Sequence, residues 1–312
     1  MSFQRVNALA KEGTPFLLIS DFKAQNVEVY TKDELQKSDI EFCICEDFEY
    51  KEHSHFLQKM PSDFSDYKKK FDAVIDEIKS GNTYILNLTQ PTSIETELSL
   101  KEIYALANAH YKLRVRDEFV CFSPEKFVQM KDNCIHTFPM KGTIDAAIVN
   151  AKAKILSNEK EMAEHIMIVD LLRNDLSIVA KNVKVEKFRY IQKINAGEKE
   201  LLQVSSHISG ELAENWREHL GDILAALLPA GSISGAPKKS TLDIIEKIEK
   251  YERDFFSGIF AYFDGESLDS GVMIRFIEKK GDGYIYKSGG GITLDSQAEL
   301  EYEELQDKIY LP

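Results

Sequence analysis

Apolar residues between positions 64 and 80 recur every three or four places, as they do on one face of a helix. They are Phe71, Val74, Ile75 and Ile78. Ser62 or Asp63 is a candidate N-cap for this helix, and Gly81 is a stop signal. Similar patterns predict further helices at about 99–110, 145–157, 159–174, 217–228, 238–250 and 296–309.

In the strand-like segments, apolar and polar residues alternate or all residues are apolar. Several such segments follow one another along the chain without a helix between them. They lie at 84–88, 119–122, 127–130, 183–190, 258–263 and 272–277. Because helices do not alternate strictly with them, the order favours an α+β fold with antiparallel sheets covered by helices over a doubly wound parallel sheet. No linker rich in Pro, Gly or Ser divides the chain, so we expect residues 1–312 to form a single large domain.

Composition and charge narrow the class of protein. Apolar residues make up 43% of the chain and charged residues 29%, which argues against fibrous, disordered and membrane classes. The formal net charge of −13 disfavours nucleic acid or an anionic membrane as the main partner. The apolar run from Phe16 to Ile19 is too short for a signal sequence or a membrane span, so we expect a cytoplasmic protein.

The cysteines lie in strand-like segments, so we expect free thiols rather than a disulfide framework. They are Cys43, Cys45, Cys121 and Cys134. Cys43 and Cys45 alternate with apolar neighbours, as residues on one face of a strand do. His53 and His55 follow and raise the alternative of a zinc site, although this spacing is not a familiar structural-zinc pattern.

Lys141 is the first candidate for chemistry. It stands in the segment 137–144, after a predicted strand and before a predicted helix, with Pro139 and Gly142 constraining the backbone around it. A desolvated lysine can have a lowered pKa and act as a nucleophile or an acid–base group. A solvated loop lysine is the alternative.

Two glycine-rich segments could hold an anion. Residues 229–238 lead into a helix whose first N–H groups can receive a carboxylate or a phosphate, and a tight helix entry without a ligand is the alternative. Gly289–Gly291 follow a strand-like segment and would let a ligand approach the backbone closely. Arg275 lies within the predicted strand 272–277, where a charge needs a partner, either a protein carboxylate or a bound one.

Two pairs of glutamates have a spacing that places both members on one helix face: Glu161 with Glu164, and Glu301 with Glu304. Two such helices facing each other would make a site for a hard cation such as Mg²⁺. The same spacing recurs elsewhere in the chain and is a weak signal alone. Glu164, however, heads a strongly apolar helix, where a solvated face would be more polar.

These segments, in this order and spacing, resemble the chorismate-binding enzyme family. The shared motifs are Ser123-Pro-Glu125, Pro139-Met-Lys-Gly-Thr143, Glu161 to Asp175, Pro229 to Lys238, Ile274-Arg275, Gly289-Gly-Gly-Ile292 and Glu301-Tyr-Glu-Glu304. The resemblance covers roughly residues 65–312, whereas residues 1–60 are shorter than the family's usual N-terminal region and carry little signal. It implies antiparallel sheets packed as a sandwich with helices outside, as in anthranilate synthase component I.

Position 141 discriminates within the family. Anthranilate synthases have alanine there, whereas lysine is typical of aminodeoxychorismate synthase component I, which this chain resembles. The resemblance implies that Lys141 attacks the chorismate ring and displaces the 4-hydroxyl, and that ammonia then displaces the lysine to give 4-amino-4-deoxychorismate for 4-aminobenzoate and folate biosynthesis. Glu125 matches the family's acid–base glutamate. An anthranilate synthase and a non-catalytic chorismate-fold subunit are the alternatives.

The resemblance also implies ligands and a partner. Mg²⁺ would be held against the ring carboxylate by Glu161, Glu164, Glu301 and Glu304. The substrate would contact Gly142, Thr143, Arg275, Gly289, Gly291 and Lys308. No segment resembles the nucleophile loop of a glutamine amidotransferase, so ammonia would come from a separate glutaminase subunit or from solution at high concentration.

Three positions depart from the family pattern. Ile85 stands where the family has glutamine, and isochorismate synthases have an essential lysine there, so that activity is disfavoured. Gln203 replaces a histidine, and Phe256 replaces a tyrosine. We expect these last two changes to weaken polar contacts with the substrate without removing the core set of site residues.

Overall fold

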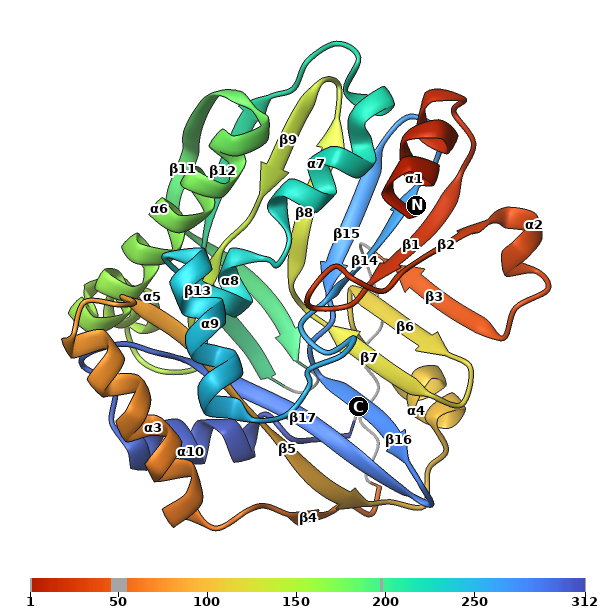
Figure 1. Ribbon diagram of the computed structural model, residues 1–312. Helices are drawn as coiled ribbons and strands as arrows, with labels where there is room; N and C mark the ends of the chain where they lie inside the picture. Colours follow the sequence, from red (N-terminus) through yellow and green to blue (C-terminus); the bar gives the residue numbers. More distant parts are fainter. Residues whose placement is uncertain (1, 46–54, 197–198, 312) are drawn as a thin grey trace.

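The computed structural model describes residues 2–45, 55–196 and 199–311, and two antiparallel sheets form its centre (Figure 1). The first sheet has the order β10-β12-β9-β8-β15-β14-β1-β2, and β11 pairs with β12. Its strands are β1 Phe16–Ser20, β2 Val27–Thr31, β8 Lys126–Lys131, β9 Cys134–Thr137, β10 Met140–Asp145, β11 Lys181–Ala196, β12 Lys199–Glu211, β14 Ile259–Phe263 and β15 Leu268–Val272.

The second sheet has the order β13-β5-β17-β16-β7-β6-β3, and β4 pairs with β5. Its strands are β3 Ile40–Ile44, β4 Gln58–Met60, β5 Ile85–Glu95, β6 Tyr111–Val115, β7 Phe119–Ser123, β13 Gly235–Ala236, β16 Phe276–Lys280 and β17 Gly283–Ile292. The long antiparallel pairing of β5 with β17 brings residues 85 and 292 to the same end of the sheet.

Helices cover the outer faces of the sheets (Figure 1). Helix α6 packs on β10, β11 and β12, α1 packs on α7, and α3 and α10 lie side by side near β17. The helices are α1 Ser2–Lys11, α2 Lys32–Leu35, α3 Phe64–Lys79, α4 Leu100–Leu106, α5 Ala151–Ser157, α6 Glu159–Val179, α7 Leu220–Leu227, α8 Gly231–Ser234, α9 Lys238–Glu249 and α10 Ala298–Asp307, with a 3₁₀ turn at Trp216–His219.

Strands that are apolar throughout are buried on both faces. In β1, Leu17 and Ile19 join a core that also contains Leu113 of the second sheet, whereas Phe16 and Leu18 join the core beneath the helices. Alternate residues of a strand point to opposite faces, so one continuous apolar run fills both layers. This packing confirms the expected α+β fold, with antiparallel sheets and helices outside.

The predicted helices all have counterparts, but three others were not predicted. Helices α2 and α8 have only four residues each. Helix α1 has ten residues, of which only Val6 and Ala10 are buried, so its apolar stripe is narrow. Propensity and periodicity carry little information over such short or weakly patterned segments.

Three sequence-based assignments were wrong in detail. The predicted strand 272–277 is broken, because Arg275 adopts a left-handed φ of 52° where the chain crosses from β15 to β16 and so changes sheets. Lys141 lies within β10 rather than in a loop. The glycines Gly289–Gly291 continue β17 and pair with β5, and at Gly289 the two backbones approach too closely for a side chain.

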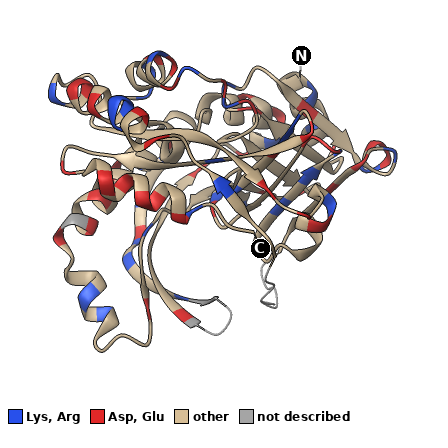
Figure 2. Ribbon diagram, turned by 90° about the horizontal axis from the view of Figure 1, so that it is seen from below, with Lys and Arg blue, Asp and Glu red and all other residues tan. Residues whose placement is uncertain are grey.

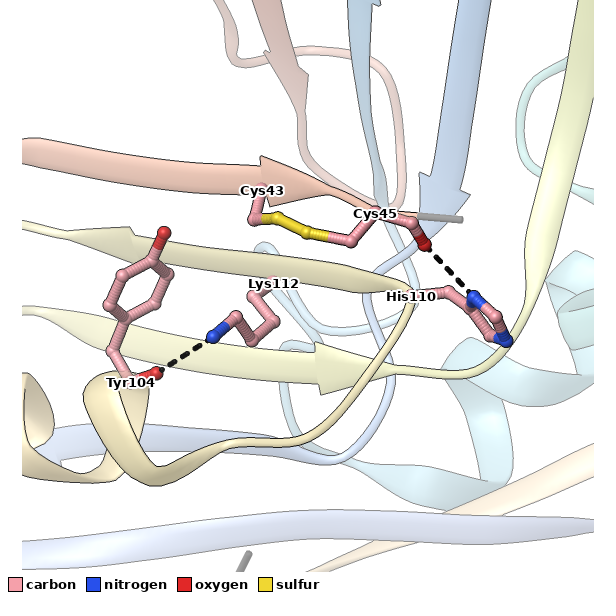
Figure 3. Close-up of a disulfide and its surroundings, with 5 residues drawn as sticks. All are labelled: Cys43, Cys45, Tyr104, His110 and Lys112. Carbon is pink, nitrogen blue, oxygen red and sulfur yellow. Dashed lines mark hydrogen bonds between the residues drawn. A yellow bond between two sulfur atoms is a disulfide. The ribbon is translucent and has the colours of Figure 1, made fainter. Parts of the chain in front are cut away.

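The expectation of free thiols was wrong for two of the four cysteines. Cys43 in β3 and Cys45 just beyond it form a disulfide (Figure 3). Their Cα atoms are 5.7 Å apart, since residues i and i+2 of a strand lie on one face, and this spacing suits a disulfide. The bond occupies both sulfurs that the zinc alternative required, and His53 lies outside the described residues. Cys121 and Cys134 are free.

Charged residues of both signs are interspersed over the elements of the molecule (Figure 2). Among the described residues, no helix is both long enough and apolar enough to cross a membrane.

Candidate active site

A cavity of about 300 Å³ lies between strands of the two sheets, with α8 on its border. This volume is at the lower end of the range for small-molecule sites. Nine of the twelve residues that the sequence singled out line it: Glu125, Lys141, Gly142, Thr143, Arg275, Gly289, Gly291, Glu304 and Lys308. They come from segments that are far apart in the chain.

Lys141 projects from β10 into this cavity. The register of β10 against β12 shifts between Met140 and Thr143, and Gly142 has a left-handed φ of 84°, so the strand carries an irregularity beside the lysine. The Nζ atom lies 3.4 Å from Oε2 of Glu164 on α6. A side chain that is 29% exposed and ion-paired across two elements does not match the solvated loop lysine of the alternative reading.

Glu125 follows β7 and precedes β8, where its main-chain N–H donates to the Ser123 hydroxyl over 3.1 Å. The Ser232 hydroxyl donates to its Oε1 atom over 2.6 Å. Burial raises the pKa of the Glu125 carboxyl, while the Ser232 hydrogen bond and nearby cations oppose that rise. A carboxyl that keeps its proton to higher pH is suited to act as a general acid.

Five cationic side chains line the cavity and give it local positive charge: Lys126, Lys141, Arg275, Lys287 and Lys308. Lys141, Arg275 and Lys308 all act on the Glu125 carboxyl. The Lys308 Nζ atom donates to the Gly289 carbonyl over 2.8 Å, and the Arg275 guanidinium lies 5.7 Å from the centre of the Tyr310 ring. Such a group of cations can bind a small anion in spite of the overall charge of −13.

The four candidate metal ligands approach from two helices. On α6, Glu164 contacts Lys141, and a Cβ atom placed on Gly142 would lie 3.1 Å from Oε2 of Glu161. On α10, Glu304 and Glu301 approach the segment around Gly290. The Oε1 atom of Glu304 lies 2.7 Å from the Lys308 Nζ atom, and a Cβ atom placed on Gly290 would lie 3.4 Å from Oε2 of Glu301.

These four side chains supply only carboxylate oxygens, the donor type that Mg²⁺ prefers. Within residues 2–45, 55–196 and 199–311, no three His, Cys, Asp or Glu side chains are gathered closely enough to enclose a metal ion as they stand. Their donor chemistry is therefore of the type that Mg²⁺ takes, whereas the described side chains are not drawn together around one point.

The segment 229–238 contributes to the site in a way the sequence did not identify. Its residues form α8, the two-residue strand β13 and the start of α9, and Lys238 forms an ion pair of 3.1 Å with Asp175. Ser232 in α8 lines the cavity and contacts Glu125. The two serines of the segment look alike in sequence, and only the turn of α8 determines that Ser232 faces the carboxyl.

Comparison with known proteins identifies the family and the fold. A sequence profile of the chorismate binding enzymes matches residues 8–311. The chain belongs to the chorismate-binding enzyme family. The match begins within α1, so it includes most of the N-terminal part in which the motifs carried little signal.

Individual relatives fall into three groups. An uncharacterised PabA-like protein of Haemophilus influenzae is 48% identical over 314 residues, covering 99% of this chain and 95% of the relative. Aminodeoxychorismate synthase component 1 of Salmonella typhimurium is 34% identical over 261 residues, covering 78% of this chain but 56% of that enzyme. The crystal structure of anthranilate synthase component I from Streptococcus pneumoniae has a TM-score of 0.69 and 26% identity, covering 85% of this chain and 60% of that one.

These relatives confirm the family resemblance and the fold, and they make this chain a member of a chorismate-utilising group. The chain spans just over half the length of the Salmonella synthase that it matches.

The departures from the family pattern lie at the same cavity. Gln203 and Phe256 line it. A Cβ atom placed on Gly291 would lie 3.5 Å from Cδ1 of Ile85 and 3.8 Å from Nζ of Lys141, so Ile85 presents an apolar surface close to the lysine.

Proposed function

We propose that this chain aminates chorismate, as component I of an aminodeoxychorismate synthase. The observation that carries the proposal is the position of Lys141 in the wall of a cation-lined cavity that also holds Glu125. A lysine can act as a nucleophile and a carboxyl with a raised pKa as an acid, and the family binds chorismate. The sequence similarity to aminodeoxychorismate synthase component 1 supports this choice.

The reaction proceeds in two substitutions. The Lys141 ammonium first gives up a proton to solvent, and the neutral amine then forms a C–N bond to the chorismate ring. The 4-hydroxyl leaves as water with a proton from Glu125. Ammonia then forms a new C–N bond and the lysine leaves as the free amine, while the Glu125 carboxylate takes up the proton that ammonia loses. The enolpyruvyl group stays in place, and the product is 4-amino-4-deoxychorismate.

The remaining residues bind and orient the substrate. Arg275, Lys308 and the N–H groups of Gly289 and Gly291 hold the enolpyruvyl carboxylate, while Gly142 and Thr143 line the ring. The four glutamates of α6 and α10 would hold Mg²⁺, which would supply positive charge to bind the ring carboxylate. A glutamine amidotransferase subunit supplies the ammonia, and free ammonium at high concentration replaces it.

Covalent trapping tests the role of Lys141. The chain incubated with chorismate and Mg²⁺, quenched and digested, is expected to carry a chorismate-derived adduct on the peptide that contains Lys141. With ammonium added, 4-amino-4-deoxychorismate accumulates. The Lys141→Ala variant is expected to show neither the adduct nor turnover, with a loss of at least about 10³-fold, since the covalent route is closed.

Other outcomes lead to different functions. Fluorescent anthranilate and pyruvate formed by this chain alone would identify an anthranilate synthase. No turnover by the folded wild-type chain with ammonium, Mg²⁺ and chorismate would indicate a non-catalytic subunit.

The metal assignment has its own test. Glu301→Gln removes one negative donor, so we expect it to weaken Mg²⁺ binding by about 10- to 100-fold, measured by calorimetry in the presence of chorismate. Glu303→Gln is the matched control, because Glu303 lies on the exposed side of the same helix. Equal affinity in the two variants would remove Glu301 from the metal site.

A further inference from the structure

We propose that Ser232 is a positioning residue, whose hydroxyl donates to Glu125 and orients this carboxyl for proton transfer. The role of Glu125 in that transfer rests on the proposed function, but the hydrogen bond itself does not. The donor and acceptor oxygens are 2.6 Å apart, a length typical of a hydroxyl bonded to a charged carboxylate. Ser232 also lines the cavity, so the pair faces the bound substrate.

The main chain around Ser232 is held by neighbouring side chains. The next carbonyl, that of Ile233, accepts from Asn87 Nδ2 over 3.1 Å and from the Arg253 guanidinium over 2.9 Å. Arg253 is itself buried in an ion pair with Glu249, at 2.6 Å. One turn of helix has little stability alone, so these contacts give α8 its defined position.

Glu125 is held independently of α8. Its N–H donates to the Ser123 hydroxyl over 3.1 Å, and its carbonyl accepts from the Val272 N–H over 3.0 Å. Two segments that are 107 residues apart therefore meet at a single side-chain hydrogen bond. A bond between two anchored backbones restricts the rotamer of the carboxyl, which a flexible partner would not do.

The charged groups around Glu125 explain why such a bond is useful. Lys141 faces it from β10, Arg275 from the β15–β16 connection, and Lys308 from the end of α10, and each lowers the pKa of the carboxyl against the effect of burial. A bound dianion neutralises part of this positive charge. The Ser232 hydroxyl is uncharged, so it continues to direct one carboxyl oxygen after the substrate has bound.

The direct test is a pH titration of the Glu125 carboxyl. It is monitored by ¹³C NMR of the full chain labelled at glutamate Cδ. The resonance is assigned from its absence in Glu125→Gln. Because the serine donates to the ionised form, Ser232→Ala is expected to move the titration midpoint upward by about one pH unit. Ser232→Thr keeps the hydroxyl and is expected to restore the wild-type midpoint.

Controls make the result specific. Ser232→Cys preserves the packing with a much weaker donor and is expected to behave like Ser232→Ala. If the alanine variant folds poorly, the cysteine variant still tests the hydrogen bond. Ser240→Ala removes a hydroxyl that donates to the Asn82 carbonyl and is expected to leave the midpoint unchanged. An unchanged or lowered midpoint in both Ser232→Ala and Ser232→Cys would overturn the proposal.

Kinetics provide a readout for the positioning role. If chorismate is aminated, Ser232→Ala is expected to lower kcat about tenfold or more with little change in KM. The alkaline limb of its pH–rate profile is expected to shift to higher pH. Ser232→Thr is expected to have the wild-type kcat and pH profile. A raised KM with unchanged kcat would contradict the positioning role. Failure of the wild-type chain to aminate chorismate would reject the proposed function alone, because the NMR titration needs no turnover.

Discussion

Individual side chains give the cavity a charge opposite to that of the whole molecule. The chain carries −13, yet Lys141, Arg275 and Lys308 all act on one carboxyl in the cavity wall. Charges a few ångströms away in a partly desolvated site outweigh dispersed charges that salt screens. The acidic composition therefore disfavours anionic polymers as partners without disfavouring a small dianion.

His165 follows Glu164 in the α6 motif and is fully buried, with Nε2 2.7 Å from the Ser206 hydroxyl. Burial lowers its pKa from 6.5 to about 4. The unfolded chain thus binds a proton that the folded chain does not bind between these pH values. We expect the free energy of unfolding to be intact above pH 6.5 and to fall by about 3 kcal/mol as the pH drops to 4.

Chemical denaturation at several pH values checks this prediction. His165→Gln keeps an amide near the Ser206 hydroxyl and is expected to remove most of this part of the pH dependence. His219→Gln is the control, because His219 is exposed. The same slope in wild type and His165→Gln would show that other groups cause the loss.

At the scale of elements, the glycines of β17 differ in whether the strand pairing leaves room for a side chain. A Cβ atom on Gly289 would lie 2.5 Å from Thr89 Cγ2 and 2.7 Å from the Leu88 carbonyl, so the side chain would force β17 away from β5. On Gly291, the nearest atoms would be at 3.5 Å on Ile85 and 3.8 Å on Lys141, which are ordinary contacts.

The matched variants separate folding from function. Gly289→Ala is expected to lower the free energy of unfolding by about 1–3 kcal/mol, measured by denaturant titration. Gly291→Ala is expected to keep wild-type stability and lose about 10- to 100-fold in kcat/KM, because its methyl group occupies space beside Lys141. Equal stability of the two variants would show that the β5–β17 pairing tolerates a side chain at both positions.

At the scale of the whole molecule, a buried ion pair joins the second sheet to two helices. Arg253 bonds Glu249 of α9, the Ile233 carbonyl of α8 and the Asn87 carbonyl of β5, and Glu249 accepts from the Thr89 N–H. Both ionic side chains are almost completely buried. The pair thereby links α8, which carries Ser232 at the cavity, to α9 and to β5 of the second sheet.

Arg253→Met is expected to cost about 3–5 kcal/mol in the free energy of unfolding, because it leaves the Glu249 charge buried without its cation. Denaturant unfolding measures this cost. The exposed pair of Lys68 and Asp72 is the control, and Lys68→Ala is expected to cost at most about 1 kcal/mol. A cost for Arg253→Met as small as for Lys68→Ala would mean that the charge of Glu249 is neutralised by another route.

Local patterns determined much of this protein in advance. The spacing of apolar residues predicted the longer helices and the strands β5, β7, β8, β11 and β14. Burial of one helix face leaves a period of 3.6 in the sequence, and burial of both strand faces leaves a continuous apolar run. The motifs around Lys141, Glu125 and Arg275 predicted which residues would meet, because a resemblance to a known family carries its tertiary contacts with it.

Only the tertiary structure decided the conformation of the residues at which sequence periodicity and turn propensity failed. Arg275 breaks an apolar run because the chain changes sheets there. Lys141 lies in a strand because β12 pairs with the residues on either side of it, Met140 and Thr143. Ser232 faces Glu125 because contacts from β5 and Arg253 hold α8 in place. Each outcome depends on partners many residues away, whose energies have no counterpart in a local pattern. The sequence by itself determined the elements and the chemistry available, and long-range packing decided how that chemistry is assembled.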